Sequence, residues 1–155
     1  MVDMVQLRQA GPADAAAART LTRAAYAKWV PVIGREPKPM TADYDAAVRE
    51  HRIDFAYVGG ELAAMIETIA GDDHLLVENV AVAPGYQGLG LGRELMAHAE
   101  RLAAAQRYGE IRLYTNQMFA ENIALYARLG YRVDREEESL LGVTVHMSKR
   151  LGEPS

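Results

Sequence analysis

A glycine-rich turn is the segment whose residue types could do the most chemistry. Residues 87–93 read Gln-Gly-Leu-Gly-Leu-Gly-Arg, and they follow an apolar stretch that ends at Pro84. Glycines let a backbone approach a ligand closely, and the first amide groups of a helix are unpaired and favour an anion. Because a helix is expected to begin within this turn, the segment predicts a cradle for a diphosphate.

The spacing of the glycines excludes two common diphosphate motifs. A dinucleotide-binding fingerprint needs glycines at its first, third and sixth positions, but counting from Gly88 the sixth position is Arg93. A P-loop needs Lys and then Ser or Thr after its last glycine, whereas Leu91 and Gly92 follow Gly90. The pattern that remains is Gln-x-x-Gly-x-Gly, preceded by Val-Ala-Val-Ala-Pro.

Two side chains elsewhere in the chain are suited to moving protons. Tyr126 lies on a short expected helix, and because the pKa of an ordinary tyrosine is about 10, its hydroxyl can donate a proton at neutral pH. Glu78 lies on an expected strand, in phase with the valines that follow it, and is the candidate base. His74, near the start of that strand, is a second and weaker candidate.

The sequence argues against a covalent intermediate and against a metal. There is no cysteine, and none of Ser139, Ser148 and Ser155 lies in a Gly-x-Ser-x-Gly elbow. The four histidines lack the short spacings of metal ligands, and His98 is expected on the exposed face of its helix. We therefore expect a reaction in which a chemical group passes from one bound reactant to the other without a covalent enzyme intermediate and without a metal.

The expected elements alternate between strands and helices. Asp14 can cap a helix that runs to about Trp29, and prolines and glycines predict a loop over 30–40. Gly59-Gly60 predicts a hairpin. The other expected elements are strands at 5–8, 54–58, 62–69, 75–82, 111–115, 131–134 and 141–147, and helices at about 41–50, 91–107 and 120–129. This order predicts a mixed α/β (α+β) fold.

Length and composition favour one globular domain over 1–155. Hydrophobic residues make up 50% of the 155 residues and charged residues 25%, which allows a buried core. The formal net charge of -4 argues against nucleic acid as the main partner. The first residues lack the apolar core of a signal peptide, and no apolar run is long enough to span a membrane. We expect a cytoplasmic protein without membrane partners.

Two segments together resemble the GNAT superfamily of N-acetyltransferases. The pattern at 80–93 is similar to its motif A, Gln or Arg, two residues, Gly, one residue, then Gly or Ala. Residues 121–131, Glu-Asn-Ile-Ala-Leu-Tyr-Ala-Arg-Leu-Gly-Tyr, look like its motif B, a short helix that carries a tyrosine and ends in Leu-Gly-aromatic. The two motifs occur in the family's order and spacing.

The resemblance implies a GNAT fold, a central and mostly antiparallel twisted sheet flanked by helices, with acetyl-CoA as cosubstrate. In that fold the strand before motif A splays from its neighbour and pairs with the pantetheine arm of CoA, and the loop amides bind the pyrophosphate. An amide of this strand could also hold the thioester oxygen. The cofactor-binding residues implied are Val80, Ala81, Val82, Gln87, Gly88, Leu89, Gly90, Leu91, Gly92 and Arg93.

The resemblance also implies roles for single side chains. Tyr126 would protonate the departing CoA thiolate, and Glu78 would be the base, commonly through a water. Many members carry an asparagine seven residues before the tyrosine, where it contacts the CoA arm, but Phe119 stands there in this chain. We expect Asn122, one helical turn before Tyr126, to replace it.

The acceptor pocket is expected at the first two helices and their loop. Its candidate substrate-binding residues are Tyr26, Trp29, Met40 and Tyr44, which lie beside prolines and suit an apolar wall or a contact with a cation. The run 134–138, Asp-Arg-Glu-Glu-Glu, is expected to be an acidic, solvated turn.

These observations predict an N-acetyltransferase that moves the acetyl group of acetyl-CoA to a primary amine by direct transfer in a ternary complex. The alternatives are a non-catalytic acyl-CoA-binding or regulatory module, and an acetyltransferase for protein lysines or N-termini. A closed apolar pocket would favour a small-molecule amine as partner, and an open groove would favour a peptide amine. The sequence leaves a homodimer open.

Overall fold

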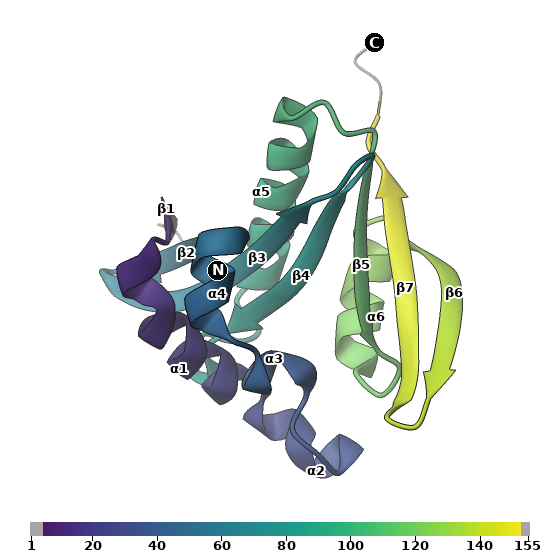
Figure 1. The fold of residues 1–155 in the computed structure, drawn as a ribbon, viewed down its shortest axis with the longest axis horizontal. Helices are drawn as coiled ribbons and strands as arrows, with labels where there is room; N and C mark the ends of the chain where they lie inside the picture. Colours follow the sequence, from purple (N-terminus) through teal and green to yellow (C-terminus); the bar gives the residue numbers. More distant parts are fainter. Residues whose placement is uncertain (1–4, 153–155) are drawn as a thin grey trace.

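A seven-stranded sheet organises the chain, and the computed structural model describes residues 5–152 of it (Figure 1). The strands are β1 (Val5–Gln9), β2 (Arg52–Val58), β3 (Glu61–Ala70), β4 (Leu75–Val82), β5 (Glu110–Asn116), β6 (Arg132–Ser139) and β7 (Gly142–Arg150). Their order is β1-β2-β3-β4-β5-β7-β6, and every neighbouring pair is antiparallel except β4 and β5. The predicted mixed α/β class with a mostly antiparallel sheet is confirmed.

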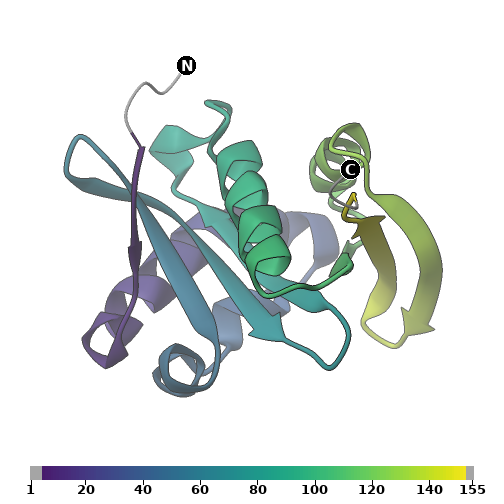
Figure 2. The same cartoon turned by 90° about the horizontal axis from the view of Figure 1, so that it is seen from above.

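Helices cover both faces of the sheet. They are α1 (Ala15–Tyr26), α2 (Val30–Ile33), α3 (Lys38–Thr41), α4 (Tyr44–Glu50), α5 (Leu91–Ala105) and α6 (Ala120–Arg128). Figure 2 shows α1 and α4 on the face opposite α5, with α6 beside the β6–β7 hairpin. Within residues 5–152, no helix combines the length and the apolar character needed to cross a membrane.

Apolar side chains hold the central strands from both faces. On one face α5 packs against the sheet, with a core that includes Ile66, Leu75, Leu91, Leu95, Met96, Ala99 and Ile111. On the other face α1 and α4 pack, with a core that includes Ala18, Leu21, Tyr44, Phe55, Met65 and Ala81. Because β3 and β4 are packed on both faces, the polar side chains that these strands carry are held in place.

The proline-rich segment after α1 is not the loop that the sequence predicted. Residues 30–33 and 38–41 form α2 and α3, and Pro31 and Pro39 each lie in the first turn of their helix. A proline is tolerated there because the first helical N–H groups have no partner in any case. Gly34 then ends α2 in the left-handed conformation, with φ 75°.

The first helix also differs from expectation at both ends. Asp14 precedes α1, but its carboxylate accepts a hydrogen bond from the Gly11 amide at 2.8 Å and pairs with Arg8 at 3.0 Å, so it does not cap the helix. The α-helix ends at Tyr26, and a 3₁₀ turn continues it to Trp29. Asp43, in contrast, caps α4 through the Ala46 amide, so the helix expected at about 41–50 begins at Tyr44.

The acidic run 134–138 lies in strand β6 and not in a turn. All residues of β6 are exposed, and the strand pairs only with β7. An edge strand leaves a row of backbone groups free, and charged side chains along it discourage pairing with other chains. The acidic residues therefore suit a protected edge, and the turn of the hairpin is at 140–141.

The parallel pair β4–β5 separates after a short contact. Its register consists of Leu75 opposite Ile111, Leu76 opposite Arg112 and Val77 opposite Leu113. Beyond these positions neither strand pairs with the other, and Figure 1 shows the two ribbons diverging. The predicted splay of this strand is confirmed.

The buried carboxylate of Asp54 joins α5 to the sheet. His98 was expected at the surface, but its side chain is 15% exposed and its Nε2 lies 3.3 Å from Oδ2 of Asp54. Arg52 Nε donates to the same carboxylate at 2.9 Å. Burial by itself would raise the pKa of Asp54, but the contacts with His98 and Arg52 outweigh it and lower the pKa. His98 is buried because α5 lies close enough to β2 for its side chain to reach Asp54.

We expect Asp54→Asn to lower the free energy of unfolding by about 2 kcal/mol at pH 7, since it removes one charge of a buried pair. A carboxyl group whose pKa is lowered by folding stabilises the fold above its unfolded pKa of about 3.9 and loses this effect as the pH falls through the folded pKa. The difference should therefore shrink as the pH falls below about 3.9. Denaturant unfolding at both pH values measures it, and Asp45→Asn, at an exposed pair with Arg19, should change stability by less than about 0.5 kcal/mol.

Candidate active site

A cavity of about 440 Å³ lies where β4 and β5 separate. Its walls come from α1, the α2–α4 region, strands β3, β4, β5 and β7, and α6. The polar and aromatic residues that line it include Tyr26, Arg35, Lys38, Asp43, Tyr44, Glu50, His51, Glu67, Glu78, Asn79, Tyr114, Asn116, Phe119, Asn122 and Tyr126. The splay therefore opens into a chamber that collects titratable groups from distant parts of the chain.

A β-bulge places Glu78 at this cavity. In the β3–β4 register Thr68 lies opposite Val77 and Glu67 lies opposite Asn79, so Glu78 has no partner. The extra residue reverses the alternation of side chains, and Val77 and Val80 consequently pack on the same core. The prediction that Glu78 is in phase with Val80 and Val82 is therefore wrong, although Glu78 does line the cavity.

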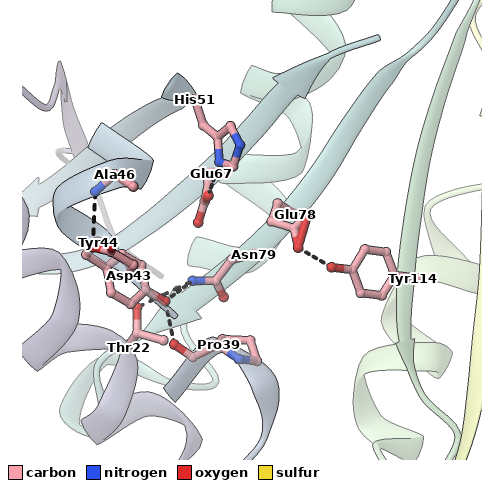
Figure 3. Close-up of polar contacts among 10 residues, drawn as sticks. All are labelled: Thr22, Pro39, Asp43, Tyr44, Ala46, His51, Glu67, Glu78, Asn79 and Tyr114. Carbon is pink, nitrogen blue, oxygen red and sulfur yellow. Dashed lines mark hydrogen bonds and ion pairs between the residues drawn. The ribbon is translucent and has the colours of Figure 1, made fainter. Parts of the chain in front are cut away.

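Tyr114 on β5 bridges the splay to Glu78. Its hydroxyl donates to Oε1 of Glu78 (Figure 3). Burial raises the pKa of Tyr114, and the hydrogen bond to the Glu78 carboxylate raises it further, so this phenol stays protonated. The sequence analysis did not identify Tyr114, because only the tertiary fold brings it to a residue 36 positions away.

A buried network around Asn79 positions the aromatic wall of the cavity. Tyr26 donates to Asn79 Oδ1 at 2.9 Å, and Asn79 Nδ2 donates to Tyr44 at 3.2 Å and to Thr22 at 3.4 Å. The Tyr44 hydroxyl in turn donates to the carbonyl of Pro39 at 2.6 Å. Tyr26 and Tyr44 thus reach the cavity as predicted, held to the sheet by an asparagine that the sequence analysis missed.

Trp29 and Met40 do not line the cavity. Both are buried, at 9% and 6% exposure, and the Trp29 ring stacks on Phe119 with centroids 4.5 Å apart. Phe119, at the position where the resemblance implied an asparagine, does line the cavity. The structure thus gives both residues packing roles: Trp29 packs on Phe119 just before α6, and Met40 is buried on α3, which contacts α1.

The sequence analysis also missed a pair formed by Glu67 and His51. The Glu67 side chain on β3 is 5% exposed, and its Oε2 lies 2.6 Å from Nδ1 of His51, which follows α4 (Figure 3). Burial raises the pKa of Glu67, and the contact with His51 reduces this shift without cancelling it. The available signal was a single carboxylate in the apolar run 62–70.

Tyr126 projects from α6 into the cavity. Its side chain is 9% exposed, and its hydroxyl makes no hydrogen bond with any residue in the described part of the chain. Burial raises the pKa of Tyr126 to about 12, so its hydroxyl carries a proton throughout the neutral range. Asn122 also lines the cavity, one turn earlier on the same helix.

The free edge of β4 presents backbone groups toward the splay. The carbonyl of Val80 accepts from the Tyr26 hydroxyl at 3.1 Å, and that of Val82 accepts from Gln87 Nε2 at 2.9 Å. The N–H and C=O of one residue in a strand point to the same side, so the amides of these two valines also face the opening. Ala81, between them, is buried against α1.

The glycine-rich loop leads from β4 into α5 with an unusual backbone. Gly88 and Gly90 have φ values of 80° and 88°, and a Cβ added at either position would meet no atom within 4 Å. Within residues 5–152, the N–H groups of 88–93 have no acceptor. Leu89 is exposed, and Arg93 makes no ion pair with any residue that the structure describes. These features form an open cradle for an anion.

His74 lies away from this chamber. Its Nδ1 is 2.8 Å from Asp73 at the turn between β3 and β4, and it is not among the residues that line the cavity. We therefore do not retain it as a base.

A model of the Acetyltransferase (GNAT) family matches residues 18–131. Streptothricin acetyltransferase from Streptomyces lavendulae is 37% identical to the chain over 81 residues, which are 50% of this chain and 43% of that protein. The match thus spans less than half the length of that relative.

Solved structures show the same fold. PaiA N-acetyltransferase from Thermoplasma acidophilum, in complex with coenzyme A, matches with a TM-score of 0.84 and 16% identity over 96% of this chain and 100% of that chain. Nourseothricin acetyltransferase matches with a TM-score of 0.74 and 22% identity over 96% and 99%. At these identities the similarities establish the fold alone.

We expect Gly90→Ala to lower the free energy of unfolding by about 1 kcal/mol, because a Cβ is disfavoured at its positive φ even though space is available. Gly85→Ala is the matched control in the same loop, since its backbone lacks a positive φ and a Cβ there is also unobstructed. Denaturant unfolding of the two variants separates backbone strain from crowding. Equal losses of stability in the two variants would contradict a left-handed backbone at Gly90.

Proposed function

Since this chain belongs to the GNAT family of acetyltransferases, we propose that it transfers the acetyl group of acetyl-CoA directly to a primary amine of a small molecule. The family assignment makes it an acetyl-CoA-dependent transferase. The observation that carries the finer proposal is the chamber at the β4–β5 splay, which holds the carboxylates of Glu67 and Glu78 together with the protonated phenol of Tyr126.

The chain's own residues suit acetyl-CoA. The unpaired amides of 88–93 and the cation of Arg93 would hold its pyrophosphate, and the free edge at Val80 and Val82 would pair with the pantetheine arm. Asn122 would contact the same arm. Gln87 acts differently, because its side chain is bonded to Val82 and to Lys28, so it would fix the loop and contribute only its backbone. Acetyl-CoA supplies an activated thioester.

Three groups would then act on the reaction. Glu78 is the proposed base for the acceptor nitrogen, and its bond to Tyr114 leaves its other carboxylate oxygen available. An amide of Val80 or Val82 would stabilise negative charge on the thioester oxygen. Tyr126, whose hydroxyl has no other partner among the described residues, would protonate the departing sulfur.

Two features support a small cationic acceptor over a peptide. Arg35 Nη2 donates to the carbonyl of Leu141 at 3.0 Å, which joins the segment between α2 and α3 to the β6–β7 turn. Arg35 also lines the cavity, and the cavity volume of about 440 Å³ suits a small ligand. The carboxylates of Asp43 and Glu50 add negative charge to the lining. The names of two similar proteins mention streptothricin and nourseothricin, and small amines of this kind belong in the first acceptor screen.

We expect acetyl-CoA at one hundred times its dissociation constant to stabilise the fold by about 2.7 kcal/mol. Gly90→Asp should remove this effect, because it places a negative charge against the phosphates. Thermal unfolding with and without ligand measures both, with Gly85→Ala as the control that keeps the effect. A shift with NADH and none with acetyl-CoA would contradict the proposal.

Tyr126→Phe tests the proposed acid. The variant keeps the ring and its packing, so acetyl-CoA binding should stay within a few-fold of the wild type. Turnover should fall by roughly 10- to 1000-fold, because the lost interaction acts in the transition state. Steady-state thiol release with an accepted amine gives both numbers. Full activity in a folded Tyr126→Phe protein would exclude Tyr126 from the mechanism.

A further inference from the structure

Acetylation of a protonated amine removes two protons from its nitrogen. One N–H bond must break before the nitrogen can attack the thioester, and a second must break as the amide forms. The sulfur takes up one proton, supplied by Tyr126 under the proposed function. The other proton has to leave the cavity and reach the solvent, so the site needs an outlet as well as a base.

The pair Glu67–His51 has the position and chemistry of such an outlet. Glu67 is almost completely buried and lines the cavity, on the strand next to Glu78. Oε2 of Glu67 is held by His51 Nδ1 at 2.6 Å, and Oε1 makes no hydrogen bond with a residue within 5–152. One oxygen of Glu67 therefore remains available to an acceptor nitrogen, while the other leads to the imidazole.

His51, which also lines the cavity, is a partly exposed neighbour of this buried carboxylate. Its side chain is 28% exposed, and its Nε2 has no hydrogen-bond partner in the described part of the chain. The backbone N–H of His51 donates to the Ala47 carbonyl at 2.9 Å at the end of α4, which fixes the position of the residue. One ring nitrogen thus faces Glu67, and the other is free to exchange protons with solvent.

We propose that Glu67 and His51 carry the first proton from the acceptor ammonium to the solvent, while Glu78 takes the second proton as the amide forms. The inference rests on the proposed function. An ammonium N–H bond breaks and an O–H bond forms on Glu67. That proton then passes to Nδ1 of His51, and the imidazolium releases a proton from Nε2. The second proton, taken by Glu78, replaces through the solvent the one that Tyr126 gives to the sulfur, so that one proton is released in each turnover. Glu67 acts on the substrate directly, and His51 acts through Glu67.

The groups that face Glu67 are compatible with this role. Besides His51, they are Glu78 from β4, Tyr44 from α4 and Tyr114 from β5. Burial raises the pKa of both phenols above its ordinary value. They stay protonated and do not compete for the proton. The negative charge of Glu78 and the burial of Glu67 both raise the pKa of Glu67, which makes it a better proton acceptor.

Reaction rates with two very small amines distinguish a proton outlet at Glu67 and His51 from a purely structural role of these residues. At pH 7 methylamine is protonated and hydroxylamine is largely neutral, and both are small enough to enter the cavity. His51→Gln, which cannot be protonated, should slow enzyme-dependent thiol release with methylamine by roughly 100-fold and with hydroxylamine by less than about 3-fold. Glu67→Gln should show the same pattern. Glu78→Gln should slow both amines, since the second proton leaves in each case.

His74→Gln is the matched control, because it removes a histidine that is paired with a carboxylate outside the cavity. It should leave both rates unchanged. Imidazole added to His51→Ala should restore the methylamine rate, and the defect should diminish as the pH rises toward the pKa of methylamine. If a His51→Gln protein that still binds acetyl-CoA releases thiol equally slowly with both amines, or at the wild-type rate with both, the proposed proton outlet is wrong and the proposed function is unaffected. A wild type that binds acetyl-CoA but releases no thiol with any amine would overturn the proposed function as well.

Discussion

The separation of β4 from β5 after Val77 and Leu113 is the constraint on which the rest of the site depends. A parallel pair that stops early leaves backbone N–H and C=O groups without strand partners, and such groups require other partners. Side chains of Tyr26 and Gln87 satisfy the carbonyls of Val80 and Val82. The corresponding amides remain directed at the opening, which is the arrangement that a thioester and its pantetheine arm need.

The same separation makes room for charge inside the protein. Carboxylates are costly to bury unless each has a hydrogen-bond donor. The Tyr114 hydroxyl on β5 donates to Glu78, and Nδ1 of His51, between α4 and β2, lies 2.6 Å from Oε2 of Glu67. Each pairing occupies one oxygen and leaves the other toward the cavity. The site therefore combines an acidic chamber with a phenol that burial keeps protonated.

The two halves of the site have different structural origins. The anion cradle is one continuous segment, 87–93, whose glycines and helix start supply everything it needs. The proposed acceptor side is assembled from separate elements, and the bond between Arg35 and Leu141 joins the segment between α2 and α3 to the β6–β7 turn. Under the proposed function, substitutions in these short helices would change the acceptor without touching the cradle.

Local patterns in the sequence determined the mixed α/β fold, the Gly59-Gly60 hairpin, the cradle and the helix of Tyr126, because left-handed glycines and unpaired helix-start amides are properties of consecutive residues. The prolines of 30–40 were ambiguous, since the first turn of a helix accepts proline as readily as a loop does. Only the tertiary structure decided the bulge at Glu78 and the partners of Glu78 and Glu67. Those partners lie 36 and 16 residues away along the chain, and packing of separate elements, which no local pattern encodes, brings them together.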